Sequence, residues 1–345
     1  PHAEALDWII QEMEDCLDMV DDSNYDASPS HVKKTVVEGI LARVCLWRAG
    51  EPSKGGKPYY EKAAKYAKAV YDSKKHKLNP DVYAMWKALA SDQYETTYNE
   101  SMWEVEFVGT RDDGSYTESR IGNVIGNLQE NSAGTGAGYT YAFYAGSLIL
   151  WDLYDAKDAR RDLAMAPYKL NNKDVQVAWK DNQIVDRRCG KYRREWESSS
   201  PKQENYCLLR YADVLLMLAE AENEANQGPT ALAYTCINEV RKRAGIDEVK
   251  DLSYGDFQKL IRDERGRELC FESLRKYDLV RWGIYYKAIK EDLGAAVNDA
   301  RWSTANNAKG AAQYVSNTTE KNQFLPIPTK ELGVNTKLEQ NKYWK

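Results

Sequence analysis

Apolar residues recur at helical spacing in two parts of the chain. Tyr60, Ala63, Ala67 and Val70, for example, lie on one face of the pattern, as in an amphipathic helix. The later part holds two such stretches separated by a Gly-Pro pair at 228–229, which is typical of a turn. Together these patterns predict antiparallel helix pairs, with helices over residues 7–20, 36–49, 59–72, 208–225 and 230–244.

The segments between these helices differ in character. Residues 101–108 alternate like a short β-strand. Residues 109–146 are rich in Gly, Asn, Ser and Tyr and predict a long loop, and long ordered loops in compact domains are usually functional. Residues 294–322 predict a second irregular segment. We therefore predict a mostly α fold with a helical scaffold over 1–90 and 205–290, an irregular insertion with short strands over 91–204 as the ligand face, and an irregular loop and tail over 291–345.

Charge and composition exclude several classes of protein. The formal net charge is −5 and no basic stripe occurs, which argues against binding to nucleic-acid phosphates. The sequence has no apolar run long enough to span a bilayer. It begins at Pro1, which we interpret as a cut start, with the native N-terminus missing.

The cysteines and histidines do not predict a metal site. Cys189 and Cys207 could form a disulfide, although their spacing does not require one. No CxxC occurs and the three histidines lack ligand spacing, so we expect neither a bound metal nor a cofactor. The remaining cysteines fall in helical patterns, where a free cysteine acts as a small hydrophobic residue: Cys16, Cys45, Cys236 and Cys270.

Residues 260–283, LIRDERGRELCFESLRKYDLVRWG, combine many charges with large apolar residues. Glu264 and Glu268 lie one helical turn apart, and such a pair could act as a general acid and base. The abundance of nearby arginines instead favours buried ion pairs that hold a helix in place. No nucleophile elbow, Walker loop or HExxH motif occurs, so we predict a protein that is not an enzyme.

A second acidic stretch, residues 155–162 (DAKDARRD), lacks the ligand spacing of a calcium loop. We interpret it as a capped helix start.

Aromatic residues are concentrated in the irregular segments. The chain has 24 Tyr and 10 Trp but 5 Phe, and Tyr and Trp combine a flat apolar face with a hydrogen-bonding edge. Such faces suit the C–H surfaces of sugar rings, which makes a glycan platform the predicted function of the loops. The alternative is that some of these rings, such as Trp103 and Trp151, are buried where loops meet helices. The candidate ligand-binding residues are Tyr139, Tyr141, Tyr144, Trp196 and Trp302.

Four motifs occur in an order that resembles the SusD/RagB family of cell-surface nutrient-binding lipoproteins. Residues 210–221 (RYADVLLMLAEA) and 237–245 (INEVRKRAG) are similar to a helix pair of that family. The segment 263–283 resembles its core signature, and residues 325–343 resemble its closing motif. In the closing motif, Thr336 and Lys342 stand where the family often has proline.

The resemblance implies a scaffold of helix pairs like those of tetratricopeptide (TPR) repeats, with irregular insertions as the ligand face and the 263–283 segment as scaffold. It implies a cell-surface outer-membrane lipoprotein, attached by a lipid anchor on an upstream segment that also completes part of the glycan site. It further implies delivery of a glycan to a partner, a SusC-like TonB-dependent transporter. Alternatives are a peptide receptor of the same family, a TPR adaptor or, less favoured, a helical glycosidase.

Overall fold

The computed structural model describes residues 2–20, 28–107, 109–110, 116–117, 119–130, 139–197, 204–303 and 306–345. The chain is mostly helical, and three two-stranded antiparallel sheets make up its named strands in these ranges. The predicted mostly α fold class is therefore confirmed. Within the described residues, none of the helices combines the length and the apolarity that a bilayer-spanning segment needs.

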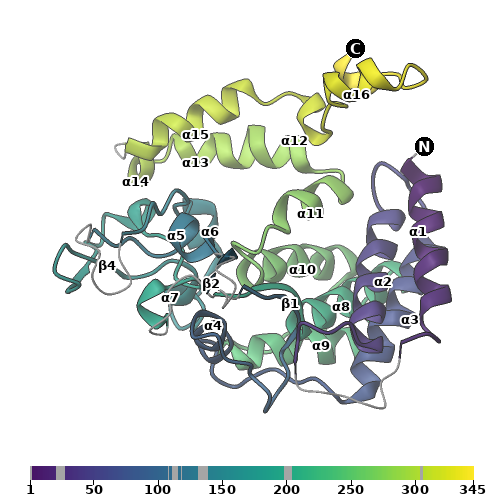
Figure 1. The fold of residues 1–345 in the computed structure, drawn as a ribbon, viewed down its shortest axis with the longest axis horizontal. Coiled ribbons are helices and arrows are strands. Elements are labelled where there is room, and N and C mark those ends of the chain that lie inside the picture. Colours follow the sequence, from purple (N-terminus) through teal and green to yellow (C-terminus); the bar gives the residue numbers. More distant parts are fainter. Residues whose placement is uncertain are drawn as a thin grey trace.

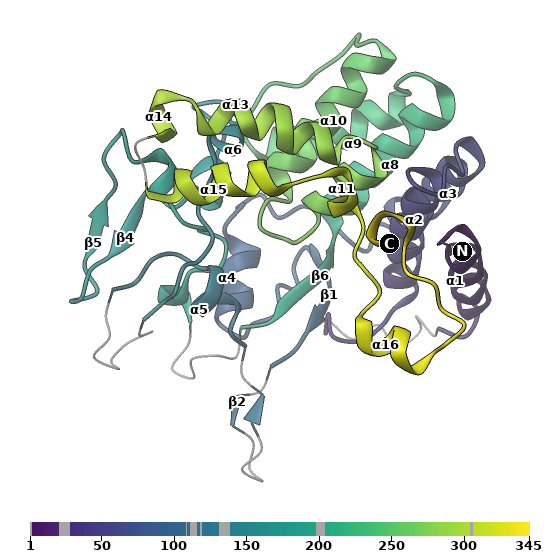
Figure 2. The ribbon, with the colours of Figure 1, turned by 90° about the horizontal axis from the view of Figure 1, so that it is seen from above.

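The helical scaffold gathers at one side of the molecule, around helix α8 (Figures 1 and 2). Helix α8 packs on α2, α3, α9 and α10, so nearly every one of its residues is buried. Its small side chains, such as Ala212 and Ala219, allow the neighbouring helices to approach closely. The scaffold helices are α1 (His2–Cys16), α2 (Lys34–Ala49), α3 (Lys57–Ser73), α8 (Tyr211–Asn226), α9 (Ala231–Arg243) and α10 (Tyr254–Glu268).

The start of α8 differs from the sequence prediction, which began the helix at residue 208. Strand β6 (Tyr206–Arg210) pairs antiparallel with β1 (Ser101–Val105) and runs directly into the helix. Leu208 belongs to this strand, because its neighbours Cys207 and Leu209 both pair with β1 before the chain turns into α8. The strand predicted over residues 101–108 is present as β1 over Ser101–Val105, but its burial does not alternate strictly, because the ladder is irregular around Trp103.

The segment between α3 and β6 forms short elements around two further small cores. One core includes Leu148, Tyr154 and Met165, and the other includes Trp86 and Tyr192. In its described part, the loop predicted over 109–146 contains one short helix and two short strands, whereas residues 111–115, 118 and 131–138 lie outside the described residues. The elements are α4 (Ala84–Ala90), β2 (Gly109–Thr110), β3 (Tyr116–Thr117), α5 (Ile121–Ile125), α6 (Leu148–Leu153), α7 (Arg161–Ala164), β4 (Tyr168–Leu170), β5 (Gln176–Ala178), η1 (Ile184–Asp186) and η2 (Arg194–Trp196).

The C-terminal part forms a layer that lies across the body, where an irregular segment was predicted (Figures 1 and 2). The prediction for residues 294–322 was wrong, because the polar, Ala-rich run 306–317 forms a helix that packs on α13 and η3. The elements are α11 (Arg275–Arg281), α12 (Tyr285–Lys287), the π-helix η3 (Ala288–Leu293), α13 (Gly294–Val297), α14 (Ala300–Ser303), α15 (Asn306–Asn317), η4 (Glu320–Gln323), α16 (Thr329–Val334) and η5 (Lys342–Trp344).

All six cysteines are free thiols. The disulfide considered between Cys189 and Cys207 does not form, and both side chains are buried. Burial raises the pKa of each of these two thiols to about 12, so both stay protonated and pack as small hydrophobic groups.

The start of α10 offers a local test of helix capping. The Ser253 side chain accepts a hydrogen bond from the backbone N–H of Asp256 at 3.2 Å. Ser253→Ala should lower the free energy of unfolding by about 1 kcal/mol, because a helix-end N–H loses its partner. Urea denaturation measures this loss. Ser253→Asp, which can accept the same bond, should retain most of the stability, and equal losses in both variants would contradict the capping role.

Candidate functional site

Three exposed aromatic rings form a row on the surface beside α5, and we call Tyr139, Tyr141 and Phe143 the aromatic ladder. The exposed fractions of these residues are 45%, 45% and 70%, whereas Thr140 and Ala142 between them are buried. The Tyr139 and Tyr141 ring centroids are 5.5 Å apart at nearly right angles. The Tyr141 and Phe143 rings stack at 5.2 Å with 12° between their planes. The ladder is thus a continuous apolar strip with hydroxyl groups on two of its rings.

The backbone of the ladder is fixed by hydrogen bonds to α5. The N–H groups of Tyr141 and Phe143 donate to the carbonyls of Asn123 and Val124 at 2.8 and 2.9 Å. The Asn123 side-chain amide donates to the carbonyl of Tyr139 at 2.7 Å. Because these peptide groups find their partners inward, the rings face outward on a defined frame.

Thr140 adds a buried attachment on the other side of the strip. Its hydroxyl donates to the carbonyl of Asn127 and accepts the N–H of Gln129, both at 2.8 Å. Since Thr140 is fully buried, these bonds resist displacement by water, and they pin the middle of the ladder segment.

A buried group of charges lies behind the ladder. The Arg194 guanidinium donates to the carbonyl of Tyr139 at 2.9 Å and to the carboxylate of Glu197 at 2.7 Å. Glu204 accepts the N–H of Gly122, the second residue of α5, at 2.7 Å. Burial, with a smaller contribution from the Glu197 charge, raises the pKa of Glu204 to about 8. Arg194 therefore supports the ladder at Tyr139, and Glu204 supports the start of α5 at Gly122.

Tyr144 continues the exposed surface at the end of the ladder. Its side chain is 56% exposed and borders a mostly apolar pocket of 520 Å³. Phe107, Ile121 and Tyr206 contribute to the pocket wall. Tyr139, Tyr141 and Tyr144 of the predicted set are therefore brought together on one surface.

The two tryptophans of the predicted set lie elsewhere. Trp196 is half-buried, with its ring 6.2 Å from Tyr83 and the Arg193 guanidinium 4.9 Å from its centroid. Trp302 is only 4% exposed, and its indole N–H donates to the side chain of Asn307 at 2.9 Å. Trp302 fills one of the small cores, so its assignment to the ligand surface is withdrawn. Trp302 lies within the short helix α14, whose surrounding sequence resembles a loop, and this explains the error.

Phe143 is the ladder residue that the sequence prediction left out of its set. The signal was present, because an aromatic residue stands at every second position from 139 to 143 while the intervening residues are small. That period is the one by which an extended chain places side chains on a single face.

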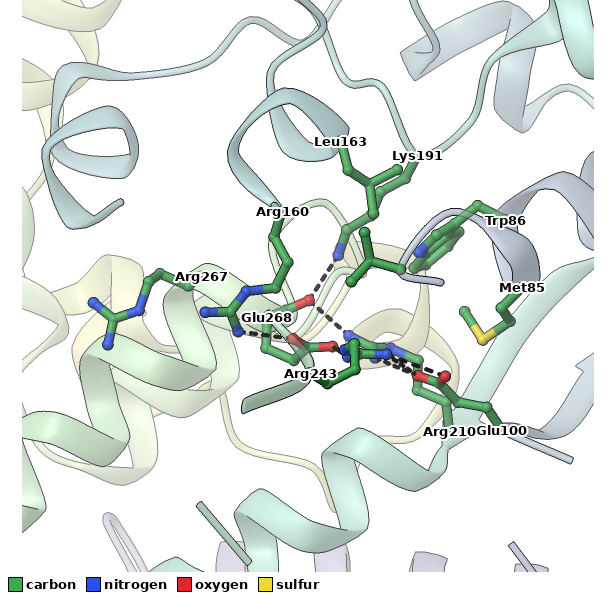
Figure 3. A pocket seen from close by; sticks show the side chains of 11 residues that line it. Met85, Trp86, Glu100, Arg160, Leu163, Lys191, Arg210, Arg243, Arg267 and Glu268 are labelled. Carbon is green, nitrogen blue, oxygen red and sulfur yellow. Dashed lines mark hydrogen bonds and ion pairs between the residues drawn. The ribbon is translucent and has the colours of Figure 1, made fainter. Parts of the chain in front are cut away.

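The two glutamates of α10 belong to a buried charge network rather than to a catalytic pair, and Figure 3 shows Glu268 within this network. Glu268 accepts hydrogen bonds from Arg160 at 2.8 Å, from Arg210 at 2.6 Å, and from Arg243. Glu264 is bonded to Arg160, Arg241 and Arg267. The cationic neighbours hold the pKa of both carboxyls below its ordinary value against the opposing effect of burial. The structural interpretation of these glutamates is thus confirmed.

Part of this network was missed by sequence reasoning. Arg160 comes from the DARRD stretch interpreted as a helix start, and it also binds Asp158 at 2.7 Å. Buried Glu100 accepts from Arg243 at 3.0 Å. These residues lie far from α10 in the sequence, so no local spacing indicated their proximity. The buried charge network comprises Glu100, Asp158, Arg160, Lys191, Arg210, Arg241, Arg243, Glu264, Arg267, Glu268 and Glu272.

The described part of the chain holds no group of three or more His, Cys, Asp or Glu side chains arranged to hold a metal ion. In the acidic stretch 155–162, the Asp158 carboxylate instead forms an ion pair with Arg160.

Comparison with known proteins assigns the family. A sequence model of the SusD family matches residues 171–344, half of the chain. This chain belongs to the SusD family. The match covers the signature segment and the closing motif, so the family resemblance inferred from these motifs is confirmed.

Individual SusD-like relatives extend the similarity toward the N-terminal side. SusD-like protein P2 of Formosa agariphila is 26% identical over 304 residues, which is 81% of this chain and 56% of that protein. SusD-like protein P25 of the same organism is 41% identical over 136 residues, 38% of this chain and 23% of that protein. The chain thus spans about half the length of one of these relatives and less of the other.

Two solved structures share their fold with nearly the whole of this chain. A SusD homolog from Bacteroides thetaiotaomicron superposes with a TM-score of 0.83 at 28% identity, over 98% of this chain and 70% of that one. Surface glycan-binding protein A from the same organism, in complex with laminarihexaose, gives a TM-score of 0.68 at 19% identity, over 97% of this chain and 70% of that one. The second similarity establishes a shared fold.

Proposed function

We propose that this protein binds an oligosaccharide or a longer glycan on the aromatic ladder and does not cleave it. The observation that carries the proposal is the row of three exposed rings on a hydrogen-bonded frame. Flat aromatic faces pack against the C–H faces of sugar rings, and the hydroxyls of Tyr139 and Tyr141 can bond sugar hydroxyls. A strip fixed in advance loses little conformational entropy when a ligand binds.

The family supports this proposal. A SusD-fold relative is a surface glycan-binding protein that holds laminarihexaose, so the fold is compatible with an extended glucose oligomer. Of this chain we propose the same general activity, at the cell surface, with the identity of the sugar set by the residues around the ladder.

We further propose that the protein is a lipid-anchored outer-membrane protein that delivers its ligand to a SusC-like TonB-dependent transporter. A binder held beside a transporter raises the local concentration of ligand there, so moderate affinity is sufficient and no chemical step is required.

The glutamate pair considered as the acid and base of a glycosidase is engaged in ion pairs. Glu264 and Glu268 are buried in ion pairs with arginine, and a glycosidase needs one protonated and one ionised carboxyl beside the sugar. This arrangement supports a binding protein over the glycosidase alternative.

Replacement of the central ladder ring tests the proposal. Tyr141→Ala should weaken binding of the glycan by about tenfold or more, because the ring that contacts both of its neighbours is lost. Isothermal titration calorimetry against a panel of glucans, other polysaccharides and peptides measures the affinity. Tyr141→Phe, which keeps the ring face, should retain most of the affinity.

Tyr277→Ala is the matched control, because Tyr277 is an equally large ring, 54% exposed, on α11 rather than on the ladder. Full glycan affinity in Tyr141→Ala would refute the ladder as the binding surface. A saturable peptide signal with no glycan signal would replace the sugar proposal with the peptide-receptor alternative.

A further inference from the structure

A second pocket lies between helices α6, α10 and α11 and the π-helix η3. Its volume is 610 Å³, within the range of small-molecule sites. The wall is mainly aliphatic, with Leu150, Leu153, Leu279, Ile284 and Ile289 among its residues. We call it the aliphatic pocket. The ladder residues are not among those that line it.

Two features of the pocket wall are unusual for a plain packing defect. Four residues of η3, including Ile289 and Leu293, contribute to the wall, and π-helical turns occur frequently at functional sites. Phe271, which also lines the pocket, has a backbone φ of +64°. A bulky residue in the left-handed region is strained, and such strain persists where the surroundings enforce it, often at ligand sites.

One corner of the pocket carries two arginines that are not ion-paired with any described residue. Arg262 and Arg275 both line the pocket, and their guanidinium carbons lie 5.3 and 5.6 Å from the centroid of the Trp282 ring. We call this pair the arginine corner. The Arg275 guanidinium donates a hydrogen bond to the backbone carbonyl of Arg262 at 2.7 Å. Burial lowers the pKa of Arg275, and the charges of Arg265 and Arg262 act in the same direction against the larger opposing charges of Asp278 and Asp263. A bound anion would compensate the buried guanidinium further.

Asp278 and Asp263 of the pocket act on Arg275 through their charges, but both form their ion pairs with other cations. Asp263 is paired with Lys259 at 2.6 Å, and Asp278 is paired with Arg265 at 2.8 Å. Asp292 is exposed and lies on η3, a wall that carries neither arginine of the corner.

We propose that the aliphatic pocket binds an aliphatic carboxylate, with the acid group at the arginine corner and the alkyl chain along the leucines and isoleucines. Charge complementarity selects the carboxylate, because guanidinium forks bind carboxylates through paired hydrogen bonds. The wall selects an alkyl chain over a sugar, because Phe271 is the one aromatic residue among those described in the lining. This proposal is independent of the glycan-binding function.

The test compares decanoate with decanamide, which has the same alkyl chain but no charge. Calorimetric titration of the protein with decanoate, at concentrations too low for decanoate to form micelles, should give saturable binding. Decanamide should bind with an affinity lower by about tenfold or more. Arg275→Gln should weaken decanoate binding by about tenfold, because a charged hydrogen-bond donor is removed. Ala288→Trp should abolish decanoate binding, because the large ring would fill the pocket from the η3 wall.

Lys276→Gln is the matched control, since it removes one positive charge from the next residue, which is exposed and does not line the pocket. Its affinity for decanoate should be unchanged, and the melting temperature of each variant verifies that it is folded. The proposal is overturned if decanoate does not bind, if decanamide binds equally well, or if Arg275→Gln and Lys276→Gln have the same effect.

Discussion

Glu268→Gln should lower the free energy of unfolding by about 3–5 kcal/mol, the usual loss when one member of a buried ion network is removed. The Glu268 carboxylate accepts from Arg160, Arg210 and Arg243, and none of these three side chains is more than 6% exposed. A neutral amide can offer one oxygen acceptor and turns its NH₂ toward donors, so the remaining positive charges lose their compensation. Urea or thermal denaturation measures the loss.

A control in an exposed ion pair separates this effect from the chemistry of the substitution. Glu61 pairs with Lys57 at 3.8 Å on the surface of α3, and Glu61→Gln should change stability little, because exposed pairs contribute about 0–1 kcal/mol. If Glu268→Gln is as stable as Glu61→Gln, the buried charge network does not stabilise the fold. Glycan affinity measured on the folded fraction should be unaffected by either variant.

Glu204→Gln should stabilise the protein at alkaline pH and have no such effect in acid. The pKa of Glu204 is about 8 in the folded protein and about 4.3 for an unperturbed glutamate. Between these values the folded state holds a proton that the unfolded state has released, so stability falls as pH rises through this window and is constant above it. A neutral glutamine avoids this loss, which is on the order of a few kcal/mol at pH 8.

The measurement is the difference in unfolding free energy between Glu204→Gln and the parent protein at several pH values from 4 to 9. This difference removes the contributions of all other titrating groups. A difference that grows steadily from about pH 4.5 to about pH 8 supports the buried position of Glu204. A difference that is independent of pH would mean that the Glu204 carboxyl titrates as it does in water.

The periodic parts of the chain were predictable from sequence alone. The pattern of Tyr60, Ala63 and Val70 depends only on which face of a helix meets the core, and the helices at α3, α8 and α9 follow from it. The role of Glu264 and Glu268 was also accessible, because several arginines stand within a few turns of them in the sequence.

What could not be predicted depends on contacts between distant segments. Leu208 is a strand residue only because β1 lies beside it, and Arg160 enters the network only because the fold brings it to α10. Trp302 is buried in a core rather than exposed for the same reason. Whether an aromatic residue in an irregular segment is buried is decided by neighbours that local composition does not identify.

The alternation of buried and exposed residues in the ladder limits how its recognition surface can diverge among descendants of this sequence. Thr140 and Ala142 point inward, so an insertion or deletion of one residue would send the tyrosine rings into the interior and the small residues to the surface. Substitutions at positions 139, 141 and 143 leave the frame intact, because α5 binds the backbone rather than the rings. We therefore expect new sugar preferences to arise here by exchange of side chains at constant segment length, while changes in length are confined to neighbouring loops.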